Sequence, residues 1–307
     1  MSALDAGLGL TAALLWGLTF VASAIALQEL PPLFFTALRF VGAAAFVLVV
    51  PRPRVPWHVI LAAGMLLGAG QYGFLFVGMA SGVSPGAASV LIHTQALIMI
   101  VLAAVFLSER LAARDAIGAV LALVGIVVLA GARDASGSVA AVALVLAGAV
   151  CGGVGNLVLK RAGTASGLGM AVWMSLVPPV PLLALSLVLE GPARMTTSLA
   201  TISWQSLAAL AYSSVGATVV AFAIWGRLFS RYSSIRTAPF LLTVPLIGLA
   251  SSVVWLGEGV SLAKATGAVL IIVGLATVVL RRRAPAGASQ KSLDLDTNES
   301  DGDRRRC

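Results

Sequence analysis

Eight side chains stand out because they could bind a small polar molecule within otherwise apolar stretches. They are Trp16, Arg39, Gln71, Tyr72, His93, Gln95, Asn156 and Tyr212. Ionisable and amide groups are costly inside a lipid bilayer and usually have a function there. We therefore interpret these eight residues as candidate substrate-binding residues.

Arg39 is a cation within an apolar run that follows Pro31-Pro32. It lies seven residues past Pro32, which places it about 10 Å inside the outer end of a helix. Its guanidinium could bind a substrate carboxylate through two parallel hydrogen bonds. The alternative is that this long side chain reaches back to the membrane interface or pairs with a helix-end carbonyl.

The amides and His93 could complete such a site. An amide both donates and accepts, so Gln71, Gln95 and Asn156 could pair with the ammonium and the carboxylate of a zwitterion. Alternatively, they join neighbouring helices. His93 lies near the middle of an apolar run. It could line the substrate pathway or carry protons near neutral pH, or it could be a neutral core histidine.

Aromatic residues provide candidate walls for the site. Trp16 lies in the middle of the first apolar run, away from the interfacial belt where Trp usually occurs. This position suggests a pocket wall, with core packing as the alternative; Tyr72 and Tyr212 are further candidates. Prolines within later runs could act as hinges, because they free backbone carbonyls and permit bending. They are Pro178, Pro179, Pro181, Pro239 and Pro245.

Composition places these residues in a membrane protein. Of 307 residues, 59% are hydrophobic and 10% are charged, and the mean hydropathy is +1.02. A soluble domain carries about 25% charged residues. The net charge of +8 comes from short basic groups between apolar runs rather than from a basic stripe, so we expect no nucleic-acid partner. Two isolated cysteines and two distant histidines give no metal site, and we expect no cofactor.

Ten apolar runs are long enough to cross a bilayer, which takes roughly 20 helical residues. They are 8–27, 32–50, 58–79, 85–107, 115–132, 138–158, 168–189, 204–226, 236–256 and 263–280. Backbone polar groups in lipid must bond within their own segment, so each run is predicted to be a helix.

The basic residues indicate the orientation of these spans. With the N-terminus inside, twelve Lys and Arg fall in inner loops, whereas Arg133, Arg194 and Lys264 fall in outer loops. Because basic loops stay in the cytoplasm, we predict a multi-pass protein of a bacterial-type inner membrane with both termini cytoplasmic.

An internal repeat indicates the architecture. The pattern of Glu109–Gly125 recurs in Glu258–Gly274, 149 residues later. Each copy holds five spans, and an odd number makes the copies enter the membrane from opposite sides. The sequence therefore predicts an all-α membrane protein of ten transmembrane helices in two inverted five-helix repeats, which is typical of secondary transporters. We assign 1–134 to the first repeat, 135–283 to the second and 284–307 to a disordered cytosolic tail.

Short motifs add a family resemblance to this architecture. They are Leu15-Trp16-Gly17-Leu18-Thr19-Phe20, Leu38-Arg39-Phe40, Ser108-Glu109-Arg110-Leu111 and the repeated Gly-Ala-Val-Leu…Gly. With them, residues 8–280 resemble the EamA family of the drug/metabolite transporter superfamily. Within it, segments such as Gln71–Phe76 and Val244–Ser251 are similar to those of exporters of O-acetylserine and cysteine. At the position of His93, those exporters are expected to carry Gln.

The resemblance implies an inner-membrane exporter that works by alternating access around a central cavity between the repeats. The implied cargo is a small amino-acid-like metabolite, with cysteine or O-acetylserine as the best candidates. Other amino acids, amphiphilic drugs or, outside transporters, a channel are the alternatives. An enzyme is not expected, because the sequence has no His-Glu-x-x-His motif and no phosphate-binding Gly-x-x-x-x-Gly-Lys-Ser/Thr motif. The expected partners are the metabolite and the lipid bilayer.

Overall fold

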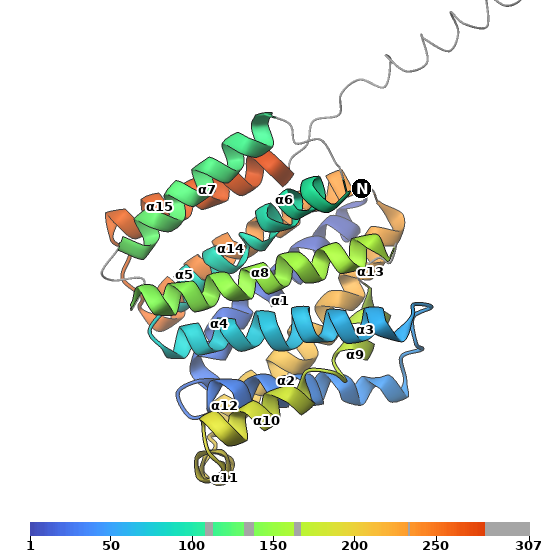
Figure 1. Ribbon diagram of the computed structural model, residues 1–307, viewed down its shortest axis with the longest axis vertical. Helices are drawn as coiled ribbons and strands as arrows, with labels where there is room; N and C mark the ends of the chain where they lie inside the picture. Colours follow the sequence, from blue (N-terminus) through green and yellow to red (C-terminus); the bar gives the residue numbers. More distant parts are fainter. Residues whose placement is uncertain (108–112, 132–137, 163–166, 233, 280–307) are drawn as a thin grey trace, which may run out of the picture.

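The computed structural model describes residues 1–107, 113–131, 138–162, 167–232 and 234–279. Every regular element among them is helical (Figure 1). Glu109, the predicted boundary between 134 and 135 and the predicted tail 284–307 lie outside the described residues.

The helices of the first half follow the predicted runs. They are α1 (Ala3–Ala26), α2 (Pro32–Ala44) with a 3-10 turn η1 (Ala45–Leu48), α3 (Trp57–Ala63), the π-helical segment η2 (Gly64–Gly70), α4 (Gln71–Ala80), α5 (Pro85–Ile92), α6 (Gln95–Leu107) and α7 (Ala113–Gly131).

The second half repeats much of this order. Its elements are α8 (Val139–Arg161), α9 (Leu168–Met174), α10 (Pro179–Leu189), α11 (Pro192–Ala200), α12 (Trp204–Ala211), the π-helical segment η3 (Tyr212–Val220), α13 (Ala221–Arg231), α14 (Ser234–Leu256) and α15 (Leu262–Val279).

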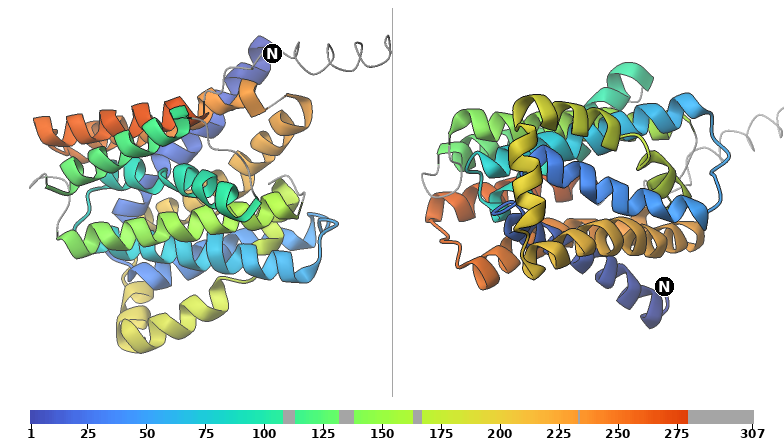
Figure 2. Two further views of the ribbon diagram at one scale, coloured as in Figure 1. Left: turned by 45° about the horizontal axis from the view of Figure 1, so that its top comes forward. Right: turned by 90° about the horizontal axis from the view of Figure 1, so that it is seen from below.

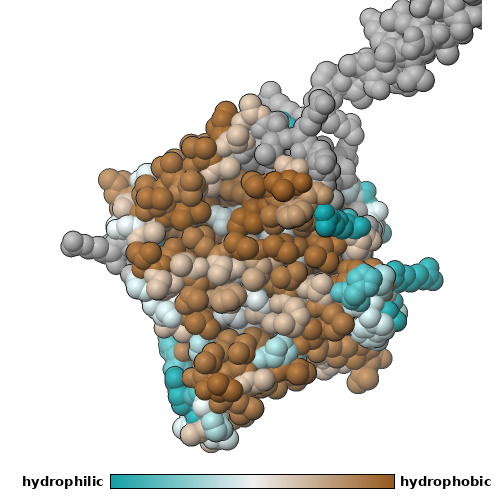
Figure 3. Space-filling model, in the orientation of Figure 1, coloured by the Kyte–Doolittle hydropathy of each residue, from teal (hydrophilic) through white to brown (hydrophobic). Residues whose placement is uncertain are grey.

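The described residues hold six helices long and apolar enough to cross a membrane, or seven if α9 and α10, bent by 41°, form one span. Three shorter apolar helices cover Pro32–Leu48, Ala116–Gly131 and Leu262–Thr277. Their 16 or 17 residues reach about 25 Å, which a locally thinned bilayer accommodates. Each predicted run overlaps one of these segments, and ten crossings remain a prediction. Figure 3 shows hydrophobic surface across the middle of the bundle, with hydrophilic residues toward its two ends.

Several helices begin directly after a serine that lies at or just before the start of a predicted run. Ser84, Ser138 and Ser203 each accept a hydrogen bond from a main-chain N–H three residues later, at 3.2 to 3.4 Å. The first N–H groups of a helix have no partner within the helix, and these side chains supply one. The local sequence therefore determines where these spans start.

The first helix of each half packs on the other half. α1 lies against α12, η3, α13 and α14, which we call the α1 group, and makes a smaller contact with α5 of its own half. α8 lies against α3, η2, α4, α5 and α6, which we call the α8 group. Glycines permit the close approach. A Cβ added to Gly17 of α1 would lie 2.5 Å from Ile247 of α14, and one added to Gly78 of α4 would lie 2.6 Å from Val145 of α8.

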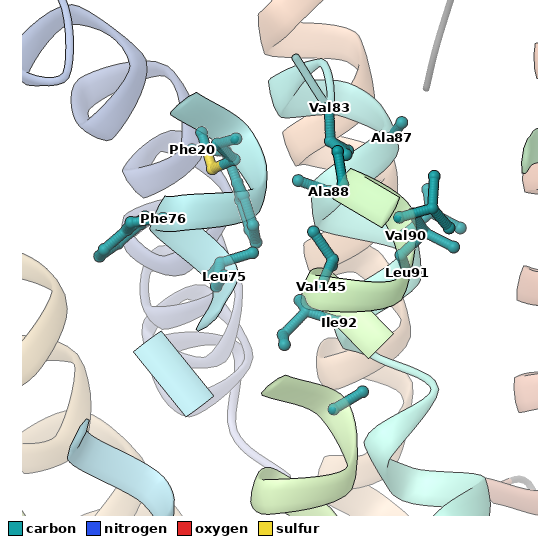
Figure 4. Packing of buried hydrophobic residues seen from close by; sticks show 14 of the residues in the cluster. Phe20, Leu75, Phe76, Val83, Ala87, Ala88, Val90, Leu91, Ile92 and Val145 are labelled. Carbon is teal, nitrogen blue, oxygen red and sulfur yellow. The ribbon is translucent and has the colours of Figure 1, made fainter. Parts of the chain in front are cut away.

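The largest apolar cluster joins these two groups (Figure 4). Phe20 comes from α1, Leu75 and Phe76 come from α4, Leu91 comes from α5, and Val145 comes from α8. All five are buried. The core therefore lies where α1, α4 and α5 of the first half meet α8 of the second half.

α7 and α15 pack closely on each other at one edge of the bundle, as Figures 1 and 2 show, and α15 also contacts α5, α6 and α14. A Cβ added to Gly125 would lie 2.7 Å from the oxygen of Gly267, and one added to Gly274 would lie 2.5 Å from that of Gly118. Gly118 and Gly125 correspond to Gly267 and Gly274 in the repeat. The lower-numbered glycine of one helix meets the higher-numbered glycine of the other, so the helices run antiparallel in a symmetric contact.

Candidate functional site

Two π-helical segments lie beside most of the candidate residues. Shifting η2 by the repeat offset of 149 gives 213–219, which lies within η3. Gln71 directly follows η2, and Tyr212 begins η3. π-Helical turns are rare and frequently mark functional sites. Equivalent spans of the two halves therefore share an irregular backbone where polar side chains enter the bundle.

Three predicted amides converge on Gly152 of α8. Asn156 Nδ2 donates to Gln95 Oε1 at 3.3 Å and to the carbonyl of Gly152 at 2.8 Å. A Cβ on Gly152 would lie 2.8 Å from Gln71 Oε1 and closer still to Gln95 Oε1. We call Gln71, Gln95, Asn156 and Gly152 the amide cluster. It presents both donors and acceptors between α4, α6 and α8.

Arg39 is enclosed by aromatic rings. Only 1% of its surface is exposed, and its guanidinium carbon lies 4.2 Å from the ring centre of Tyr72 and within 6 Å of those of Phe40 and Phe76. Nε and Nη2 each lie 3.4 Å from Thr218 Oγ1, to which they donate. We call Arg39, Phe40, Tyr72, Phe76 and Thr218 the arginine cage. The alternative that Arg39 extends to the membrane interface required its side chain to reach the protein surface, and it does not.

The charge of Arg39 has no counter-charge in the described part of the chain, because no carboxylate there forms an ion pair with it. Its Nη1 is buried without a hydrogen-bond partner among the described residues. An unpaired buried cation is unfavourable. An anion that entered the arginine cage would therefore gain a strong interaction.

Trp16 and Tyr212 join α1 to η3. Trp16 Nε1 donates to the carbonyl of Ala217 at 2.9 Å, and the Tyr212 hydroxyl donates to the carbonyl of Leu15 at 2.8 Å. Both polar atoms are therefore bonded to main chain, which leaves the rings as apolar walls. Tyr212 is also close enough to Arg39 for an electrostatic interaction.

His93 lies at the turn between α5 and α6. Its Nδ1 is 2.6 Å from the carbonyl oxygen of Ser89. A carbonyl only accepts, so Nδ1 carries a proton, and in the neutral ring Nε2 is an acceptor. The ring centre lies 6.5 Å from that of Phe20. His93 therefore lies at a break in the fourth apolar run, facing α1.

Sequence reasoning missed two residues of this arrangement. Thr218 is a hydroxyl on η3 that receives Arg39 and donates to the carbonyl of Ser213 at 3.0 Å. Gly152 provides the space that the amides occupy. A search for polar residues near position 220, the repeat equivalent of Gln71, would have suggested Thr218. No pattern in the sequence points to Gly152.

A cavity of about 510 Å³ lies away from these residues, at one end of the bundle. We call it the end cavity. It is lined by the connection between α1 and α2, by the end of α4 and by α11, and none of the eight predicted residues lines it.

Comparisons with known proteins show which family the chain is similar to. A model described as the EamA-like transporter family matches residues 5–131 and again 139–280. The chain is 36% identical over 282 residues to a "Probable amino-acid metabolite efflux pump" of Salmonella typhimurium, and equally to one of Escherichia coli K12, with 90% of this chain and 94% of each relative covered.

More distant matches extend this set. A "Probable terminal-alkyne amino-acid exporter" of Streptantibioticus cattleyicolor is 30% identical over 253 residues, covering 81% of each chain. A solved crystal structure superposes with a TM-score of 0.60 at 23% identity, covering 91% of this chain and 98% of that one. This last similarity shows the fold alone.

Proposed function

The chain belongs to the EamA-like transporter family, and from this premise we propose that it exports small amino-acid metabolites from the cytoplasm by alternating access. The family makes it a multi-pass membrane transporter and not an enzyme. The amino-acid class of cargo is supported by the names of two relatives with 36% identity. Cysteine and O-acetylserine are the best candidates within that class, because of the motifs around Gln71–Phe76 and Val244–Ser251.

The proposed topology is ten spans in two inverted repeats with both termini in the cytoplasm. The symmetric, antiparallel contact of α7 with α15 supports the inversion. The excess of basic residues in the assigned inner loops supports the orientation.

The proposed binding mode divides the cargo between the two clusters. The arginine cage holds the carboxylate at Arg39 Nη1, and the amide cluster bonds the ammonium and the polar side-chain atoms. Trp16 and Tyr212 wall the site, and His93 lines the pathway. The buried guanidinium of Arg39, whose Nη1 has no hydrogen-bond partner among the described residues, is the observation that carries this proposal.

Counterflow into proteoliposomes tests both cargo and binding mode. Labelled cysteine and O-acetylserine are the substrates, and unlabelled amino acids and cysteamine, which lacks the carboxylate, are the competitors. We expect saturable uptake that cysteine inhibits and cysteamine does not. Arg39→Lys should reduce uptake by about tenfold or more, because an ammonium lacks the planar fork.

Arg52→Lys is the matched control for this variant. Arg52 also stacks on an aromatic ring, at 4.3 Å from Trp57, but it is exposed and outside the candidate site. It should transport like the unmodified protein. Equal inhibition by cysteine and cysteamine would reject the carboxylate anchor, and absence of uptake by correctly inserted protein would reject these two cargoes.

Other amino acids are the second candidate cargo. The exporter of terminal-alkyne amino acids, at 30% identity, favours this alternative. The same competition series distinguishes it, since a larger amino acid would then inhibit more strongly than cysteine.

A further inference from the structure

Three carboxylates receive hydrogen bonds from the N-terminal backbone of a distant helix. Glu190 accepts from Leu33 N at 2.8 Å and from Phe34 N at 3.1 Å, in the first turn of α2. Glu29 accepts from Ser203 N, the cap of α12, at 2.8 Å. Glu258 Oε2 accepts from Gly86 N in the first turn of α5 at 3.0 Å. Bonds to a charged acceptor are roughly twice as strong as neutral ones.

These contacts share one end of the bundle, which we call the glutamate face. Glu29, Glu190 and Glu258 follow the ends of α1, α10 and α14, and their partners begin α12, α2 and α5. The end cavity opens there, because the connection after α1, the end of α4 and α11 line it.

The three contacts differ in which helices they join. Glu29 joins α1 to α12, which lie together in the α1 group, and Glu190 joins α10 to α2, which pack on each other. Glu258 joins α14 to α5, and of the three partner helices only α5 packs both on the α1 group and on α8.

The interface between α5 and α14 is tight near the glutamate face. A Cβ on Gly248 would lie 2.5 Å from Ser89 Cβ, and one on Gly86 would lie 2.8 Å from Leu249 and 2.9 Å from Glu258 Oε2. Beyond His93 the chain continues as α6, which packs on α8. The two helix groups are thus held together by α5 and α14 at this end, where Figure 1 shows them side by side.

Lys264 compensates the charge of Glu258 from within the same half. Lys264 Nζ contacts Glu258 Oε1 and donates to the carbonyl of Gly259 at 3.1 Å. The Lys264 side chain is fully buried, and Glu258 is 9% exposed. Separation of α14 from α5 would break the hydrogen bond between Glu258 and Gly86 N but leave the ion pair with Lys264 intact. The charge of Glu258 would therefore be paired both before and after the movement.

We propose that the Glu258–Gly86 contact is the latch that closes the transporter at the glutamate face, and that Lys264 positions the Glu258 carboxylate for it. This proposal rests on the proposed alternating-access function. Cargo leaves at this face when α5 and α14 separate, and the closed face re-forms when the first turn of α5 returns to the carboxylate.

Distance measurements between spin labels test the latch without cargo. Labels on cysteines introduced at Ser81 and Leu262, in full-length protein with Cys151 and Cys307 replaced by alanine, report the two exposed ends of α4 and α15. We expect one predominant short distance in the parent protein. Glu258→Gln should raise the ratio of long to short distances by about tenfold, the effect of losing one charge-assisted hydrogen bond.

Two further variants keep the result interpretable. Gly86→Ala leaves the ion pair intact and inserts a methyl group between α5 and Glu258, so it should also favour the long distance. If Glu258→Gln fails to fold, the distances measured in Gly86→Ala decide whether the Glu258–Gly86 contact acts as a latch. Glu29→Gln is the matched control, because it removes the same kind of bond within the α1 group; it should keep the parent distribution.

Unchanged distances in Gly86→Ala and in folded Glu258→Gln would overturn the latch, as would an equal opening in Glu29→Gln. Since no cargo is present, a wrong cargo assignment leaves this outcome unaffected. A latch that responds as expected in a protein that transports neither cysteine nor O-acetylserine would reject the cargo alone.

Discussion

Gly152 determines the geometry of the amide cluster at the scale of single residues. Gln71 and Gln95 come from different helices and meet where Gly152 has no side chain. Neither amide would reach this position if α8 carried a larger residue there. The binding properties of the cluster therefore depend on the absence of a Cβ atom at position 152 of α8.

Gly152→Ala should lower transport at subsaturating cargo by about tenfold, through the loss of one or two hydrogen bonds. The added methyl group would displace the oxygens of Gln71 and Gln95. Gly7→Ala is the control, because a Cβ at Gly7 meets no atom within 4 Å. Initial rates of counterflow, normalised to the amount of monodisperse protein, measure the effect. Equal rates in the two variants would contradict a role for the cluster.

Glu29 should make stability depend on pH in the acid range. The pKa of Glu29 lies below its ordinary value of 4.5 because its carboxylate accepts hydrogen bonds. The main-chain N–H of Ser203 makes the largest contribution, and the Ser203 side chain also contributes. A lowered pKa in the folded state stabilises the fold above pH 4.5, and this contribution disappears as the pH falls through the folded-state pKa.

The difference in Tm between the unmodified protein and Glu29→Gln should thus be constant from pH 7 to about 5 and shrink at lower pH. Thermal unfolding of purified protein across this range measures it. A difference that stays constant to pH 3 would show that protonation of Glu29 does not weaken the contact with Ser203.

At the scale of elements, the α7–α15 pair depends on its repeated glycines. A Cβ on Gly267 would lie 2.9 Å from both Gly125 O and Leu129 N. Both neighbours are backbone atoms, which move only with their helix. Gly267→Ala should therefore cost about 1–3 kcal/mol of stability, while transport per folded molecule stays unchanged because the candidate site is elsewhere.

Gly131→Ala provides the comparison within the same helix pair. Gly131 ends α7, and a Cβ there meets no atom within 4 Å. Its stability should change by no more than about 1 kcal/mol. Unfolding in denaturant distinguishes the variants, and a similar midpoint for both would indicate that α7 and α15 separate at little cost.

At the scale of the whole molecule, the exchange of α1 and α8 makes each half incomplete alone. α1 packs on the second half, and α8 packs on the first. A half expressed by itself would expose a helix whose glycine-lined face has no partner. The exchanged helices therefore join the two repeats into one folding unit.

Co-expression of two fragments, cut between Gly131 and Ser138, tests this exchange. We expect the fragments to co-purify and to transport cargo, and each fragment alone to aggregate or be degraded. Affinity purification through a tag on one fragment measures the association. A fragment that is monodisperse and thermally stable by itself would show that the exchange is not needed for folding.

The sequence by itself determined the helical class, the positions of the apolar segments and the family. Ten apolar runs, Ser and Pro at their ends and the 149-residue repeat are local patterns, and in lipid they have one structural solution because backbone polar groups must bond within a helix. The polar residues within those runs could be recognised for the same reason, since their presence in a bilayer is costly.

Only the tertiary structure decided which of these residues meet. It brought Gln71, Gln95 and Asn156 around Gly152, and it enclosed Arg39 between Tyr72 of the same half and Thr218 of the opposite half. The amide cluster depends on the packing of α8 against the first half, and both sets of contacts lie beside the π-helical segments η2 and η3. Helical periodicity alone cannot reveal them, because they arise from packing between segments far apart in the chain.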